Sequence, residues 1–246
     1  MPDKWKKLAA VLYLFTAANL STAQSSSTDQ PTSPEKKPSQ KKIAIHPISP
    51  GVLGYDNITL DTNKREVRFN AVVNQTSMII EYAIVHENGK THESLLRTSI
   101  SPFRLQTLLL IANASKILER LPEFDVEGRE KPPATPRPKH RIQILLRDLR
   151  PEAKDSRPFA LANWIQNADT GKPMQGEPWM YTGSRIYEGE YVAELEGDIV
   201  AVYLTPNAMF NSWVQGNNND EIWIPTEGIP PVDTPVEVIF KLPPVP

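Results

Sequence analysis

The chain has 246 residues, 39% of them hydrophobic, which is enough for a folded domain with a sizeable core. It contains no cysteine, so disulfides, thiolate-bound metals and iron–sulfur clusters are excluded. Its formal net charge is -2, and this mild acidity argues against a nucleic-acid partner, which would require a dense basic surface.

The N-terminus predicts export from the cytoplasm. Lys4, Lys6 and Lys7 precede an apolar run from Leu8 to Leu20, and small or polar residues follow up to Ala23. This order is typical of a secretory signal peptide cleaved near Ala23. The run is shorter than the roughly 20 apolar residues that span a bilayer. We therefore expect a periplasmic or extracellular mature chain without a transmembrane segment.

Composition then divides the mature chain. Residues 24–42 are rich in Ser, Pro and Lys and have no apolar side chain, which predicts a disordered linker. Residues 43–246 show no internal repeat and are expected to form one globular domain. Proline gathers at 121–139, which predicts a long loop within that domain or a weak boundary between two lobes.

Strand signals dominate the domain, as short runs rich in β-branched and aromatic residues. Glu66–Val73 alternates and is rich in valine, and Met78–Val85 follows it closely. A turn at Leu195–Asp198 is expected to join two further strands. The other candidate strands are 141–146, 179–181, 191–195, 199–204 and 236–242.

One segment, about residues 102–119, predicts a long helix. Ser101 is the expected N-cap and Pro102 the first helical residue. Apolar residues then cover much of the circumference, so we expect this helix to be buried against a sheet. A second short helix is possible at 160–167. The expected fold is α+β, a mainly antiparallel sheet built from hairpins and packed on one long apolar helix.

The segment from Met78 to Thr98 predicts a β-hairpin. Asn88 and Gly89 are typical of a two-residue type I′ turn, which places Glu93 opposite Ile84 on the core-facing side. The register separates the polar side chains into two sets, one on each face: His86 with Glu93, and Glu81 with His92 and Ser94.

Glu93 is the residue of this hairpin whose environment matters most. A carboxylate among apolar side chains needs a cation, hydrogen-bond donors or a raised pKa. Glu93 with His86 or His92 is thus a candidate acid/base or metal-binding pair, the alternative being a carboxylate that binds backbone donors or an arginine. Because His86 and His92 point to opposite faces, a metal site would need ligands from other segments.

A second polar cluster follows at residues 178–191. Ser184 lacks the G-x-S-x-G context of a hydrolase nucleophile, so we expect it to bond to the backbone of a glycine turn. Trp179 and Tyr181 are expected to pack within a strand. A pocket that joined this cluster to one hairpin face would have as binding residues Glu81, His92, Ser94, Trp179, Tyr181 and Ser184.

Five segments also carry a resemblance: KTHESLL, a leucine-rich helix, WMYTGS, YVAELEGDIVAVY and TPVEVIFKL. In this order, from about Gly51 to Leu242, they resemble the YdjY-type domain of exported, largely uncharacterised bacterial proteins. The resemblance implies a bacterial envelope protein. It implies no particular reaction, cofactor or catalytic residue.

Three classes of function remain open at this point. The first is a non-catalytic binding or assembly module that recognises an envelope protein or a small ligand. The second is a hydrolase that uses Glu93 with His86 or His92. The third is a metal-binding module with histidine and carboxylate ligands. The cofactor, if there is one, is unknown.

Overall fold

A computed structural model describes residues 44–116, 140–153, 157–176 and 178–244, all of which lie in the unit Lys42–Pro246. The predicted signal peptide, the 24–42 linker and the 121–139 loop lie outside the described residues. Among the helices that the structure describes, none has the length and apolar character needed to cross a bilayer.

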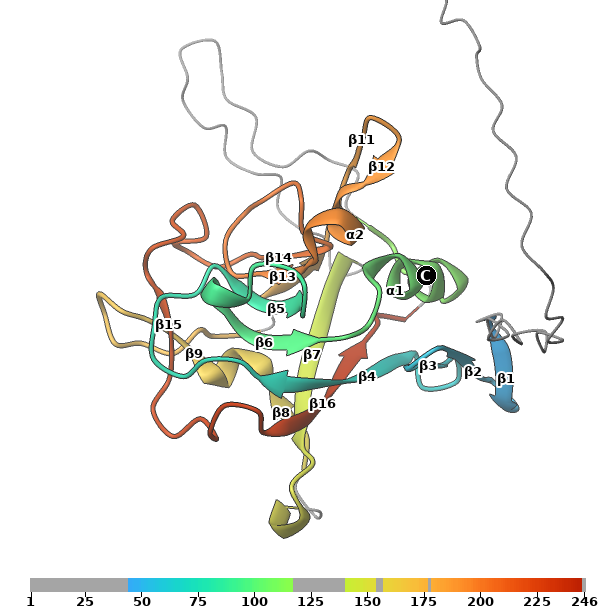
Figure 1. Ribbon diagram of the computed structural model, residues 1–246, viewed down its shortest axis with the longest axis horizontal. Coiled ribbons are helices and arrows are strands. Elements are labelled where there is room, and N and C mark those ends of the chain that lie inside the picture. Colours follow the sequence, from blue (N-terminus) through green and yellow to red (C-terminus); the bar gives the residue numbers. More distant parts are fainter. Residues whose placement is uncertain (1–43, 117–139, 154–156, 177, 245–246) are drawn as a thin grey trace, which may run out of the picture. The chain divides into compact units, whose positions relative to one another are not determined.

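Eight strands form a closed barrel (Figure 1). Around the barrel their order is β4 (Glu66–Val73), β16 (Pro235–Lys241), β7 (Arg141–Asp148), β10 (Trp179–Tyr181), β14 (Phe210–Ser212), β13 (Asp198–Ala201), β5 (Tyr82–His86) and β6 (Ser94–Thr98), which pairs with β4 again. Two neighbouring pairs, β5 with β6 and β13 with β14, are parallel, and the others are antiparallel. The barrel is therefore of mixed type.

Further short elements surround the barrel. Its sheet is extended beyond β4 by β3 (Ile58–Asp61), β2 (Val52–Tyr55) and β1 (His46–Ser49), and beyond β7 by β8 (Phe159–Ala160). Two small separate sheets pair β9 (Ile165–Asn167) with β15 (Trp223–Pro225), and β11 (Ile186–Tyr187) with β12 (Glu190–Tyr191). The described helices are α1 (Pro102–Ile111), α2 (Val192–Glu196) and the 3-10 turns η1 (Thr91–Glu93), η3 (Pro151–Ala153) and η4 (Leu161–Trp164).

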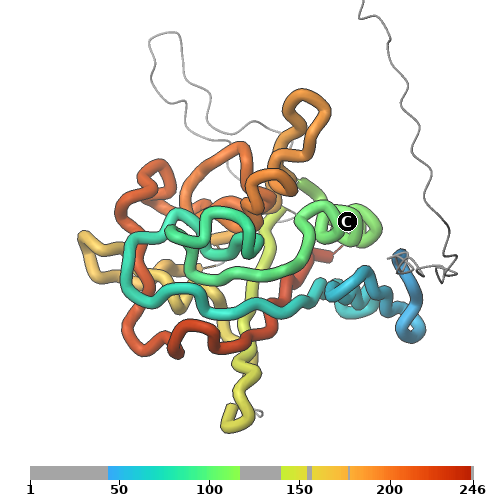
Figure 2. Tube along the Cα trace, viewed as in Figure 1, coloured from blue at the N-terminus to red at the C-terminus, as the bar shows by residue number. Residues whose placement is uncertain are grey.

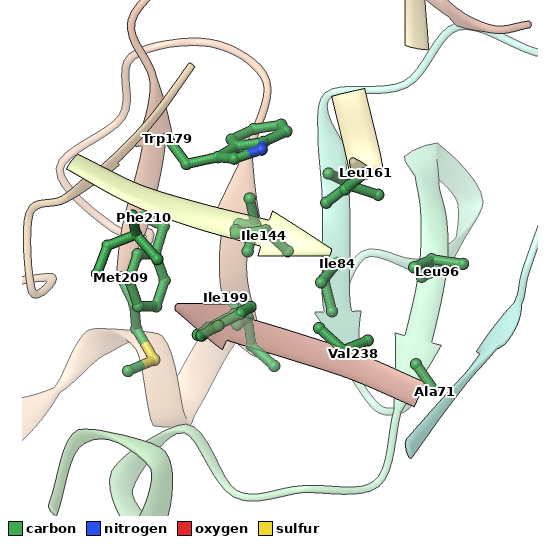
Figure 3. Close-up of a cluster of buried hydrophobic side chains, with 14 of the residues drawn as sticks. Ala71, Ile84, Leu96, Ile144, Leu161, Trp179, Ile199, Met209, Phe210 and Val238 are labelled. Carbon is green, nitrogen blue, oxygen red and sulfur yellow. The ribbon is translucent and has the colours of Figure 1, made fainter. Parts of the chain in front are cut away.

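Apolar side chains from all eight barrel strands form the core (Figure 3). Each strand contributes a labelled residue to it: Ala71, Ile84, Leu96, Ile144, Trp179, Ile199, Phe210 and Val238. Aromatic rings continue this packing, since Phe240 lies edge-on to both Phe69 and Phe210, at centroid distances of 5.4 and 4.8 Å. The barrel interior is thus filled by side chains.

The predicted α+β fold with one long helix is wrong, because the domain is mainly β. Helix α1 begins as predicted, with the Ser101 hydroxyl accepting from Arg104 N–H, but it has only ten residues. It ends where Asn113 adopts a left-handed conformation (φ 52°) and the N–H groups of Asn113 and Ala114 bond back to Leu110 and Leu109. Leu110 and Ile111 are exposed, so only one side of this helix meets the core.

The predicted strand at 191–195 is also wrong. Val192–Glu196 is helix α2, and Gly197 (φ 79°) closes it in the left-handed conformation before β13 begins at Asp198. The glycine that suggested a hairpin turn is a helix C-cap. The possible helix at 160–167 is replaced by the 3-10 turn η4 and strand β9.

The predicted antiparallel hairpin is wrong as well, because β5 and β6 are parallel neighbours, with Tyr82 beside Ser94 and Ile84 beside Leu96. Gly89 does not have the positive φ that a type I′ turn requires. Instead, a Cβ atom at Gly89 would come within 2.7 Å of the Glu196 carbonyl oxygen. Glycine is needed here because the loop after β5 packs closely on the end of α2.

Candidate functional site

The close packing of the β5–β6 connection on α2 creates a polar cluster around Lys90. The Lys90 ammonium donates to Asp198 Oδ2 (2.7 Å), Glu196 Oε2 (2.9 Å) and the Tyr82 hydroxyl (3.0 Å). We call the six residues Tyr82, Lys90, Glu196, Asp198, Tyr203 and Asn207 the Lys90 cluster.

The remaining members bind one another around this lysine. The Tyr82 hydroxyl donates to Asp198 Oδ2 at 3.1 Å and lies 3.2 Å from the Tyr203 hydroxyl. The Asn207 amide donates to Glu196 Oε2 at 2.8 Å. Since an ammonium has three N–H groups, each donor of Lys90 is already used within the protein.

Burial and charge set the ionisation of the cluster. Asp198 is fully buried, and this burial raises its pKa to about 6, although Lys90 acts in the opposite direction. Burial would also raise the pKa of Glu196, but hydrogen bonding to Lys90 keeps it below its ordinary value. Lys90 itself is partly desolvated, yet its bonds to both carboxylates raise its pKa. The cluster therefore holds one persistent cation between two unequal carboxyl groups.

The residues predicted for acid/base or metal chemistry are spread over both ends of β5. Glu93 lies on η1, where its carboxylate is 3.4 Å from His92 Nε2, and the His92 side chain is 77% exposed. His86 instead accepts a bond from Asn88 N–H at its Nδ1 and lies at the opposite end of β5 from Glu93. Partial burial and the neighbouring Glu93 carboxyl raise the pKa of Glu81. Glu93 is thus brought to Glu81 and His92 rather than to His86.

The other predicted binding residues make packing contacts and hydrogen bonds within the fold. Ser94 is buried and its hydroxyl receives a bond from the Asn74 amide. Trp179 lies in the core, and Tyr181 donates to Gln106 at 2.7 Å. Ser184 bonds to Asn207 O and accepts from Ala193 N–H, near the start of α2. Within the described ranges, no three His, Asp or Glu side chains gather in a way that could hold a metal ion.

An open groove lies at a different place, beside the small sheet of β9 and β15. Figures 1 and 2 show this sheet on the side of the barrel away from α1. One wall is the segment Lys172–Gly176, which follows β9, and the other is Trp213–Gly216, which follows β14. The part next to Trp223 has a volume of about 640 Å³, and a smaller part of about 160 Å³ reaches Arg141. We call this feature the groove.

The groove lining combines amides, apolar side chains and cations. Met174, Val214 and Trp223 supply apolar surface, and Gln175 and Gln215 are exposed amides on opposite walls. Among the described residues, the lining includes two cations, Lys172 and Arg141, and no carboxylate. Such a surface favours a ligand with negative charge.

Trp223 adds an unpartnered polar group to this lining. Its side chain is buried, 3% exposed, and the Nε1 donor has no hydrogen-bond partner within the described chain. Its Cζ2 atom would be 3.7 Å from a Cβ at Gly216, so the N–H side of the ring faces a groove residue. Because an unpaired buried donor is costly, an acceptor that reached this covered N–H from the groove would remove that cost.

Neither region was predicted as a site from the sequence. A signal for the Lys90 cluster existed, since Asp198 directly precedes the apolar run Ile199–Val202, and a carboxylate beside a buried strand needs a partner. The groove has no comparable signal. Its lining comes from loop residues and a few strand residues, with no motif or regular spacing.

In comparisons with known proteins, the chain matches no protein-family model, no curated protein and no solved structure. The resemblance to the YdjY-type domain stays a prediction.

Proposed function

We propose that this protein is a non-catalytic binding module of the bacterial envelope and that the groove is its ligand site. The observation that carries the proposal is the groove itself, an open cavity of about 640 Å³ with a cation on its wall and a buried, unpartnered Trp223 N–H. Volumes of this size, lined by apolar surface with a few polar groups, are typical of ligand sites.

The chemistry of the lining favours binding over turnover. Amides and apolar side chains bind and orient a ligand, but they neither accept nor supply protons near neutral pH. The ionisable groups of the Lys90 cluster, and the pair of Glu93 with His92, do not line the groove. The envelope location rests on the signal-peptide pattern that ends at Ala23.

A hydrolase that uses Glu93 with His92 is the second candidate, favoured by their contact of 3.4 Å and by the raised pKa of Glu81 beside Glu93. This pair is at the surface, with His92 largely exposed. An active enzyme of this kind would lose turnover in both Glu93→Gln and His92→Ala while keeping its stability.

Binding at the groove is testable with the mature chain labelled with 5-fluorotryptophan. The ¹⁹F signal of Trp223 is assigned with Trp223→Phe, and a fragment library is then screened for compounds that shift this signal. Gln215→Trp, which adds bulk to an exposed groove wall, should abolish the shifts. Asn218→Trp is the matched control, because Asn218 is exposed on the same loop but does not line the groove.

A parallel screen with ester, amide, glycoside and phosphoester substrates separates the two candidates. Fragments that shift the Trp223 signal, together with absent turnover, support the binding module. Turnover that depends on Glu93 and His92, without any fragment at Trp223, contradicts it.

A further inference from the structure

One wall of the groove is a strand edge with unused backbone hydrogen-bonding groups. The segment Lys172–Met174 runs antiparallel to β9, with Asn167 N–H donating to Lys172 O (2.9 Å) and Met174 N–H donating to Ile165 O (2.8 Å). Together with the β9–β15 pairing this makes a three-stranded arrangement whose outer member is the groove wall.

The pairing pattern determines which backbone groups face the groove side of this segment. In an antiparallel ladder, alternate residues direct their N–H and C=O groups to opposite neighbours. Lys172 and Met174 bond to β9, so Pro173 C=O and both backbone groups of Gln175 are directed the other way. No hydrogen bond of the described chain uses these three groups. Pro173 and Gln175 are exposed, so a ligand has access to them.

An edge of this kind can be extended by one more strand. An extended peptide accepts from the Gln175 N–H and donates to the Pro173 or Gln175 carbonyl, which is the main-chain part of strand addition. Its side chains alternate between the two faces of the added strand, so every second one is directed to the side that carries the apolar lining of the groove, such as Met174 and Val214. A glycan offers hydroxyl groups but lacks this repeating sequence of amide donors and acceptors.

The charges at the groove determine the kind of peptide. Lys172 lines the larger part of the groove, beside Trp223, and Arg141 lines the smaller part. The side chains of Lys172 and Arg141 are exposed. Since the described lining of both parts has these cations and no carboxylate, acidic side chains gain attraction from Lys172 and Arg141 and basic ones meet repulsion.

We propose that the groove binds an extended acidic peptide segment of a partner protein, which adds as a strand along Lys172–Gly176. This inference rests on the proposed function, since it names the ligand class of the same groove. It requires both the free strand edge and the cations, so each can be tested separately.

The probe is a short fluorescein-labelled peptide of alternating Glu and Val, titrated with the mature chain and followed by fluorescence anisotropy. A peptide of alternating Lys and Val is the charge control. The Glu-Val peptide should bind at least about tenfold more tightly, and Lys172→Glu should lower its affinity by about tenfold. Lys64→Glu, a reversal at an exposed lysine that does not line the groove, should leave the affinity unchanged.

The strand edge is tested by two further measurements. Replacing one peptide amide by an ester removes one donor and should weaken binding by about threefold to tenfold. In amide hydrogen exchange, the Gln175 N–H should become protected when the Glu-Val peptide is added. Gln175→Pro, which removes this N–H, should weaken binding by a similar factor, and the ester peptide provides the same test where this variant fails to fold.

The outcomes are distinct. Equal binding of the two peptides, or an unchanged affinity in Lys172→Glu, overturns the acidic-peptide inference. So does binding of polygalacturonate, an acidic glycan, at Trp223 without binding of the peptide, although the groove would then still be a ligand site. If neither peptide, glycan nor fragments shift the Trp223 signal, the proposed function fails as well.

Discussion

The Lys90 cluster and the groove differ in how far their hydrogen-bond donors are used, although in the cluster the buried acceptors Asp198 Oδ1 and Asn207 Oδ1 have no partner within the described chain. All three N–H groups of Lys90 are bound within the protein, and its partners include a fully buried carboxyl group. At the groove, exposed backbone groups of Pro173 and Gln175 have no partner in the described chain, and neither has the buried Trp223 N–H. The lysine donors of the cluster are therefore used within the protein, whereas donors at the groove are free of partners in the described chain.

The difference shows that ionisable residues in close contact need not mark the functional site. Charged pairs stabilise a structure by bonding to one another, and bonded donors are no longer free for a ligand. The Lys90 cluster joins the β5–β6 connection to α2 and β13. The groove carries fewer charges, but its polar groups are available.

Replacing one lysine in each region gives the largest expected contrast. Lys90→Met leaves the buried Asp198 without its cation and should lower the free energy of unfolding at pH 7 by about 3 to 5 kcal/mol. Lys172→Met removes an exposed charge and should change it by less than about 0.5 kcal/mol. Urea denaturation of both variants measures the difference. Similar losses in the two would contradict the contrast.

The pH dependence of stability isolates Asp198. Its pKa is about 6 in the folded chain and about 3.9 in an unfolded one, so the folded state binds more protons between these values. The free energy of unfolding should therefore fall, by on the order of 2 kcal/mol, as the pH rises from about 4 to 6. Denaturation curves across this range should show the fall in the wild type and a smaller one in Asp198→Asn. Parallel pH profiles would show that Asp198 does not titrate there.

The close approach that positions Lys90 is tested at Gly89. An added Cβ would be 2.7 Å from the Glu196 carbonyl oxygen, so Gly89→Ala should destabilise the protein by about 1 to 3 kcal/mol. Asn88→Ala, at the neighbouring exposed residue, is the control and should have almost no effect. Thermal unfolding compares the two, and an unaffected Gly89→Ala would mean that this loop can move away from α2.

A pair of aromatic substitutions gives the smallest contrast. Tyr82→Phe removes a hydroxyl that contacts Lys90, Asp198 and Tyr203, and should cost about 1 to 2 kcal/mol. Trp223→Phe loses packing but also removes an unpartnered donor, so its net cost should stay below about 1 kcal/mol. The same denaturation assay applies. A larger cost for Trp223→Phe would contradict the expectation that removing the unpartnered N–H offsets the lost packing.

Strands with strong local signals were predictable from the sequence. Glu66–Val73 and Trp179–Tyr181 form β4 and β10 with the predicted bounds, because β-branched and aromatic side chains suit half-buried and buried strands alike. The start of α1 followed from Ser101 and Pro102. These features depend on side chains that are near one another in sequence.

The errors arose where a glycine has a tertiary role. Gly89 permits close packing rather than a hairpin turn, and Gly197 caps a helix. Considered with its sequence neighbours alone, each glycine is typical of a tight turn. Their actual roles depend on the contact between the β5–β6 connection and the end of α2. The Lys90 cluster depends on this same contact, so local sequence patterns predicted Glu93 and not the buried Asp198 as the carboxylate in need of a partner. The groove depends on the β9–β15 pairing, which joins Gln166 to Ile224 and has no local sequence signal.

The position of β16 has a consequence for how the chain folds. This strand lies between β4 and β7, with Glu237 beside Asn70 and Val238 beside Leu146. Until β16 pairs with both, β4 and β7 each present an open edge, and ring closure must wait for contacts between residues far apart in sequence. Such long-range pairing slows folding and leaves intermediates that associate through their edges. A chain truncated before Pro235 is therefore expected to aggregate rather than to persist as a slightly weakened barrel.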